Sequence, residues 1–229
     1  MISIYKINAL YIKQFKNLMY NYFVLTGFIV PLAMTFLMRI TVEPELRGGL
    51  FIMMVQMSIL LGGGNTMCCL IAEEKEKNTL GVLMTSTVSS LDFLISNILI
   101  TSTFTVVLNI LIYAMIGTQI IEFTPFIIIT TLATIIATVL GAIIGLISKN
   151  QMSASTILSP LFLILSFIPM IFNDTIFVQN VLYFTFTEQV GLVMAGSPIT
   201  TSNIIIQIAN MLVFVGIFVF FYKKKGFSE

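Results

Sequence analysis

Five consecutive charged residues, Glu-Glu-Lys-Glu-Lys, occupy positions 73–77 and form the densest charge cluster of the sequence. The surrounding segment 72–92 holds six of the 21 formal charges, and Leu80, Leu83 and Met84 follow the cluster at helical spacing. A short helix with one apolar side can dock in the groove of a partner protein. A charge run is as often only a solvated helix face, so a plain extension of the preceding helix is the alternative.

The other residue types that carry protein chemistry are scarce. The chain has no histidine, and its two cysteines, Cys68 and Cys69, are adjacent in an apolar run, so a metal site and a disulfide framework are not expected. The two cysteines are expected to be small buried side chains rather than acylation sites, and no catalytic residue is expected. No phosphate-binding G-x-x-x-x-G-K-[ST] loop is present, since Leu61-Gly62-Gly63-Gly64-Asn65 lacks the lysine. The three glycines are expected to allow close helix packing or a hinge, and any energy source must be another chain.

The composition predicts a membrane protein. Of 229 residues 58% are hydrophobic and 9% charged, against about 25% charged in soluble domains. Uncharged runs long enough to cross a bilayer, roughly 18 residues or more, predict an all-α integral membrane fold. Its six transmembrane helices are expected near 18–38, 50–71, 95–117, 124–147, 154–172 and 203–222.

The distribution of lysine and arginine predicts the orientation. With the N-terminus in the cytoplasm, nine lysines lie inside and only Arg39 and Arg47 lie outside, as the positive-inside rule requires. Both termini are therefore expected in the cytoplasm. Arg39 and Glu122 fall at the outer ends of spans, where interfacial anchoring explains them. The absence of mid-membrane charge argues against a proton-coupled transporter.

Two segments flank this core. Residues 1–16 place Ile4, Ile7, Tyr11 and Phe15 on one helical face, which predicts an amphipathic surface helix; a basic flank of the first span is the alternative. Residues 173–202 are too apolar for a solvated loop and too broken to span, so short re-entrant or interfacial helices are expected before span six. Kinks are expected at prolines in the first and fifth spans.

The charge cluster, followed by Thr79-Leu80, Leu83, Ser86, Val88-Ser89 and a span, resembles the signature of ABC-2-type permeases, the membrane subunits of a class of ABC transporters. The resemblance covers the whole chain as one domain, 1–229, and includes the pattern at 183–196. Three positions depart from the family pattern: Asn78 replaces a frequent Gly, Thr87 a frequent Pro and Asn97 a common Lys. An Asn can still end a helix in left-handed geometry.

The resemblance implies a cytoplasmic coupling helix in segment 72–92 that docks on an ATP-binding subunit. It implies a second permease chain, identical or paralogous, and two ATP-binding subunits that carry the ATP and magnesium, with no cofactor in this chain. The implied coupling residues are Glu73, Glu74, Glu76, Thr79, Leu80, Leu83 and Ser86.

The resemblance also implies a pathway lined by the first, second and fifth spans, which supply Met53, Gln56, Met57, Ser58, Asn65, Ser159 and Ser166. Hydrogen bonds between helices are the alternative use of these polar groups. A Met- and Phe-rich pathway without charge suits an amphiphile, so the expected function is export of a hydrophobic or amphipathic substrate. A membrane-active peptide, exported from a bacterial cytoplasmic membrane for secretion or self-protection, is the preferred substrate, and a drug, lipid or polysaccharide is an alternative. The rival hypotheses are a non-transporting immunity or scaffold subunit and, more weakly, a channel.

Overall fold

The computed structural model describes residues 4–79, 89–117, 120–171 and 176–226, and every regular element in these ranges is a helix. Within these ranges, five helical segments are long and apolar enough to cross a membrane, which confirms the all-α, membrane-embedded character expected from the composition. These candidate spans are Val24–Thr41, Pro44–Glu76, Leu91–Met115, Phe123–Ile147 and Thr201–Lys223.

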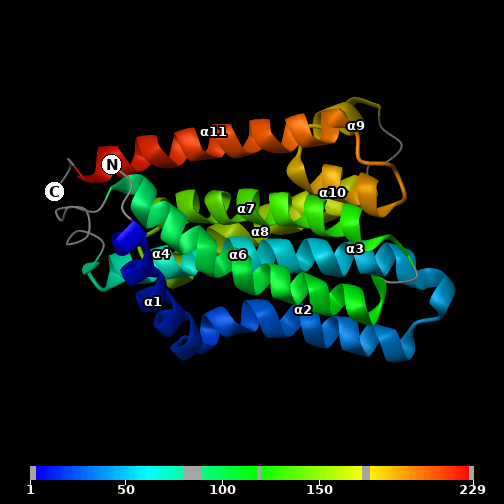
Figure 1. Cartoon of the computed structure of the whole chain (residues 1–229), viewed down its shortest axis with the longest axis horizontal. Coiled ribbons are helices and arrows are strands. Elements are labelled where there is room, and N and C mark those ends of the chain that lie inside the picture. The colour runs from blue at the N-terminus through cyan, green and yellow to red at the C-terminus, as the bar shows by residue number, and fades with distance from the viewer. Residues whose placement is uncertain (1–3, 80–88, 118–119, 172–175, 227–229) are drawn as a thin grey trace.

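The long helices run side by side in one bundle, with shorter helices at its two ends (Figure 1). One end carries α1 and the other carries α10, and we call them the α1 end and the α10 end. The bundle consists of α2 (Tyr22–Thr41), α3 (Arg47–Met57), the π-helical η2 (Ser58–Asn65), α4 (Thr66–Glu76), α6 (Ser90–Met115), α7 (Phe123–Ile147), α8 (Gln151–Ile171) and α11 (Thr201–Gly226). The short elements are α1 (Ile4–Tyr20), the 3-10 turn η1 (Pro44–Leu46), α9 (Ile176–Leu182) and α10 (Phe186–Met194).

Local capping explains where several helices begin and end. Asn21 separates α1 from α2, because its backbone is extended and its side chain accepts a hydrogen bond from Val24 N. The expected third span starts five residues early, at Ser90, because Ser89 and Asp92 form a reciprocal capping box. The expected surface helix 1–16 reaches Tyr20 and lies across the end of the bundle.

The second expected span, 50–71, is the central part of a longer helical run. The helix α3 continues through η2 into α4 without interruption and ends at Glu76, so residues 72–76 of the expected coupling segment belong to it. Residues 80–88, where the coupling helix is expected, lie outside the described residues. The fifth expected span, 154–172, coincides with α8, which is not among the five candidates above, so the count of six spans stays a prediction.

The closest helix contact lies between α7 and the η2–α4 run. A Cβ atom added to Gly141 would stand 2.0 Å from the carbonyl oxygen of Gly64, and one added to Gly145 would stand 2.7 Å from that of Cys68. Ala137 precedes these two glycines at the same four-residue spacing, and its carbonyl also lies against Gly64. Small residues at this spacing let two helix backbones touch, which is the usual basis of packing in membranes.

The glycine contact generates a stability prediction. The variant Gly141→Ala forces the Cβ atom against a backbone oxygen, so we expect a loss of about 1–3 kcal/mol and a lower apparent melting temperature in detergent. The matched control is Gly216→Ala in α11, where an added Cβ atom meets nothing within 4 Å. That variant should keep or slightly raise the melting temperature. Equal melting temperatures for the two variants would contradict the proposed backbone contact.

Candidate functional site

The acidic end of α4 is folded into the protein, with Glu74 at its centre. The Glu74 side chain is only 2% exposed. Lys13 Nζ lies 2.7 Å from Glu74 Oε1, and Gln14 Nε2 donates to the same oxygen at 2.9 Å. Both partners come from α1, so Glu74 fixes the surface helix against the end of α4.

Glu73 connects the same turn to three further places. Asn21 Nδ2, at the junction of α1 and α2, donates to Glu73 Oε2 at 2.8 Å, and Gln151 Nε2, at the start of α8, donates to it at 3.0 Å. Lys77, one turn along, forms an ion pair with Glu73. The hydrogen bond to Glu73 raises the pKa of Lys77, whose side chain is exposed, so Lys77 stays charged at neutral pH.

Lys75 and Glu76 connect the end of α4 to the helices α7 and α8. Lys75 Nζ donates to Leu146 O at 3.3 Å and to Ser148 O at 2.5 Å, so its charge lies at the carbonyl end of α7, where a cation is favoured. Glu76 is exposed, and its carboxylate accepts from Gln151 N at 3.4 Å. We call Glu73, Glu74, Lys75 and Glu76 the α4 charge cluster.

Asn78 ends the helix in the left-handed conformation, with φ 57°, which is the geometry expected where the family pattern has Gly. Thr79 then turns back, because its hydroxyl donates to Glu74 O at 3.0 Å and also bonds to the Glu74 carboxylate. Of the expected coupling residues, Glu73, Glu74, Glu76 and Thr79 therefore meet at one place. Leu80, Leu83 and Ser86 lie outside the described residues.

The α4 charge cluster ties the end of one helix to several other parts of the bundle. Its side chains join α4 to α1, to the α1–α2 junction, to α8 and to α7. A displacement of residues 77–79 would therefore be transmitted to all four of these parts of the bundle. Among the described residues, no group of three or more acidic or sulfur side chains could hold a metal ion.

The expected pathway residues do not form one continuous lining. Three of them bond between helices: Gln56 Nε2 donates to Thr187 O of α10 at 3.2 Å, Ser58 bonds to Asn109 of α6, and Asn65 Oδ1 lies 3.4 Å from Ser155 Oγ of α8. Met53 and Met57 pack against the hydrophobic core. Ser159 is exposed beside a hollow of about 560 Å³ at the α1 end, and the Ser166 side chain lies outside what the structure describes.

A polar network at the α10 end was not anticipated from the sequence. Asn203 Nδ2 donates to Gln189 Oε1 at 2.6 Å, Gln207 Nε2 to Phe186 O at 3.1 Å, and Asn210 Nδ2 to Phe184 O at 2.9 Å. The three donors follow one another at spacings of four and three along α11, so they share one face. That spacing is the sequence signal that identifies the face holding α10.

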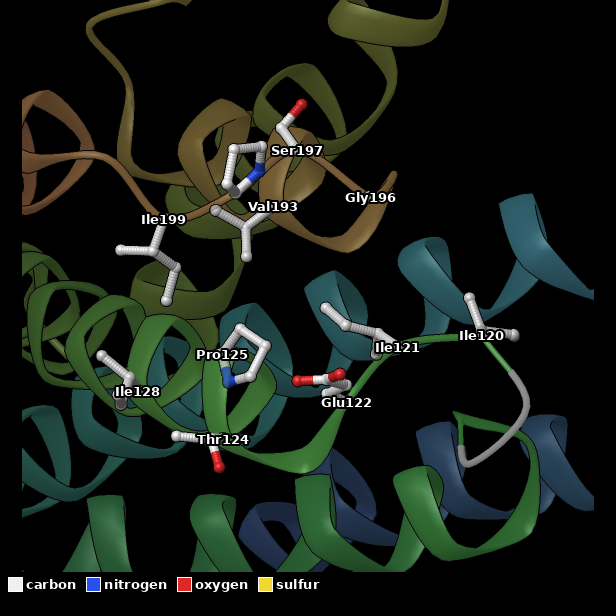
Figure 2. A pocket seen from close by; sticks show the side chains of 11 residues that line it. Ile120, Ile121, Glu122, Thr124, Pro125, Ile128, Val193, Gly196, Ser197 and Ile199 are labelled. Carbon is white, nitrogen blue, oxygen red and sulfur yellow. The ribbon is translucent and has the colours of Figure 1, made fainter.

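A hollow of about 410 Å³ opens between the start of α7 and the α10–α11 connection. Figure 2 shows apolar walls, among them Ile121, Pro125, Val193 and Ile199, and the Glu122 carboxylate between Ile121 and Pro125. Glu188 on α10 is half-buried, and burial raises its pKa. This end therefore has an apolar hollow with a carboxylate at its edge.

Comparison with known proteins adds no relative to this description. No protein-family model matches the chain, and no curated protein matches it at a significant level.

The geometry of Glu74 generates a second prediction. Glu74→Ala removes the acceptor of Lys13, Gln14 and Thr79 and should destabilise the protein by about 1–3 kcal/mol, with faster hydrogen exchange in α1. Glu74→Gln keeps an oxygen for Gln14 and should fall between the wild type and Glu74→Ala. The control is Glu76→Ala, because Glu76 is exposed and accepts a single long bond. Slow exchange in α1 of Glu74→Ala would show that α1 is held by other contacts.

Proposed function

We propose that the chain is the membrane subunit of an ATP-driven exporter of the ABC-2 type, which works with a second permease chain and two copies of an ATP-binding subunit. The α4 charge cluster is the observation that carries this proposal. A transporter subunit without a nucleotide-binding loop needs a partner that binds ATP, and a segment bonded to several helices can pass the partner's movement on to them. The end of α4 is bonded to several helices in this way.

In the proposed mechanism, the ATP-binding subunit binds segment 77–89 and moves it. Because Glu74 holds α1, Lys75 holds the end of α7 and Glu73 holds the start of α8, movement of this segment is conveyed to all three. The contact between Gly64 and Gly141 links the middle of the same run to α7. The bundle would thus tilt around η2 between two arrangements as ATP binds and is released.

We propose different roles for the individual coupling residues. Glu73 and Glu74 are engaged by Lys13, Gln14, Asn21 and Gln151, so we propose that they position the segment rather than contact the partner. The contact with the ATP-binding subunit then falls to the exposed Glu76 and to Leu80, Leu83 and Ser86.

The proposed topology has six spans, with α8 as the fifth and both termini in the cytoplasm. Two observations support it. Gln151 at the start of α8 bonds to Glu73, and Phe162 further along α8 lies against Gly64, so α8 runs antiparallel to α4. The lysines of α1, α4, the α7–α8 turn and the end of α11 all lie at the α1 end.

The proposed substrate is a hydrophobic or amphipathic compound, preferably a membrane-active peptide. The interior supports this class, because the side chains that contact one another around η2 are aliphatic, aromatic or uncharged polar groups. The rival hypothesis is an immunity or scaffold subunit without transport, for which the internal ties of Glu73 and Glu74 are merely structural. The two hypotheses differ in whether an ATP-binding subunit is required.

The coupling proposal is tested by co-expression with the ATP-binding proteins of the flanking genes, purification on a tag carried by this chain, and vanadate-sensitive ATP hydrolysis. The wild type should retain an active ATPase. Leu80→Asp combined with Leu83→Asp should abolish its retention without lowering the melting temperature, because these side chains are proposed to face the partner.

The control for that experiment is Asn150→Asp, an exposed acidic substitution at the same end of the bundle, which should leave ATPase retention unchanged. Purification of the wild type alone or with a protein that is not an ATPase would overturn the exporter proposal. It would favour the immunity or scaffold hypothesis.

The topology is tested by thiol labelling. Cys68 and Cys69 are buried, so the wild type should give little background. Ser197→Cys at the α10 end should react with a membrane-impermeant maleimide on intact cells, whereas Asn150→Cys at the α1 end should react only after permeabilisation. Both side chains are exposed, so accessibility within the protein is matched. The reverse pattern would invert the orientation.

A further inference from the structure

A groove of about 660 Å³ lies between α2 and α6, on the side of the bundle where these helices run together (Figure 1). Its walls are apolar, and one ionisable residue, Arg39, lines it near the α10 end of α2. The lining includes Ile29, Leu32, Phe36, Leu111 and Met115. The volume lies in the range of protein ligand sites, about 300–1,000 Å³.

The groove opens on the outer surface of the bundle rather than into the protein core. Ile29, Phe36 and Leu111 are exposed, as are most large apolar residues of α2. An apolar hollow on the membrane side of a transmembrane helix is filled by hydrocarbon, because water has no hydrogen-bond partners there. An acyl chain from the leaflet at the α10 end is thus the natural occupant.

The charges at the mouth of the groove favour an anionic headgroup. Arg47 folds back over the end of α2, where its Nη2 donates to Arg39 O and its Nε to Val42 O, both at 3.0 Å. The Arg47 guanidinium therefore lies at the same helix end as Arg39, beside the groove. Both ion pairs found among the described residues lie at the α1 end. Within the same part of the chain, neither Arg39 nor Arg47 lies within 4 Å of a carboxylate, although the exposed Glu43 and Glu45 lie in the intervening connection.

We propose that this groove binds an anionic phospholipid, with one acyl chain between α2 and α6 and the phosphate on Arg39 and Arg47. Guanidinium groups suit phosphate because they donate two parallel hydrogen bonds. Basic pockets between transmembrane helices bind lipid headgroups in the same manner. The site does not rest on the export proposal, but it requires that this part of α2 and α6 faces lipid rather than a second permease chain.

The absence of tryptophan from the chain allows a direct test. Phe36→Trp replaces one aromatic ring by another inside the groove and gives a single fluorophore. The purified variant is placed in phosphatidylcholine bilayers, to which brominated phosphatidylglycerol or brominated phosphatidylcholine is added at equal fractions. We expect phosphatidylglycerol to quench with an apparent affinity about fivefold higher for each arginine engaged.

The matched control reporter is Ile205→Trp on α11, at a similar distance from the α10 end. Ile205 is 61% exposed against 55% for Phe36, and no charged residue occurs between 189 and 222. This reporter should show no preference between the two lipids. An equal preference at both positions would mean a general surface effect and would overturn the site.

Two variants of the Phe36→Trp protein separate charge from shape. Arg39→Gln with Arg47→Gln should abolish the preference for phosphatidylglycerol, whereas Ala114→Phe should fill the groove and weaken quenching by both lipids. Arg39→Gln alone, which leaves the Arg47 bonds to α2 in place, guards against misfolding of the double variant. An unchanged preference after the loss of Arg39 would overturn the phosphate contact.

The comparison of the two reporters also tests whether lipid reaches the groove. If both brominated lipids quench Phe36→Trp far less than Ile205→Trp, another protein surface covers the groove, and the lipid site is overturned.

Discussion

The backbone contact between α7 and the α3–η2–α4 run is the constraint on which the other packing depends. In a membrane, helices gain little from burying apolar side chains, because lipid is equally apolar, so packing relies on close approach and polar bonds. Gly64 and Gly141 allow that approach where the run is π-helical. The neighbouring helices are arranged around the same place, with Gly27 of α2 against Leu61 and Phe162 of α8 against Gly64.

The same helical run makes polar contacts at three levels. Gln56 bonds to α10 at one end, Ser58 bonds to Asn109 of α6 in the middle, and Glu73, Glu74 and Lys75 bond to α1, α7 and α8 at the other end. One continuous element therefore touches nearly every part of the protein. A change at its charged end cannot remain local, because each rigid helix attached to it must follow or lose a bond.

The sequence predicted the helices well and their polar partners poorly. Charge intervals locate membrane helices because a buried charge is costly, and a capping box or an Asn junction shifts a boundary by only a few residues. The role of Glu74 depended on Lys13 and Gln14, some 60 positions away, and no local pattern relates them. An acidic run therefore predicted a solvated or docking face, whereas two of its carboxylates are turned inward. For Asn203, Gln207 and Asn210 the helical spacing was a usable signal, but the oxygens they bond belong to α10 and the turn before it, whose position only the fold determines.

The use of charge differs between the two ends of the bundle, and this contrast bears on both proposals. At the α1 end, Lys13, Lys75 and Lys77 are matched by carboxylates or helix carbonyls of the same chain. The proposed ATP-binding subunit would therefore meet these charges already engaged within the chain, and its recognition is proposed to use the exposed Glu76 and the apolar residues that follow Asn78. At the α10 end, Arg39 and Arg47 form no ion pair among the residues that the structure describes, and the proposed phospholipid would neutralise them. In a bilayer the nearest abundant anion at that depth is the lipid phosphate, which joins the apolar groove and the two arginines in one ligand.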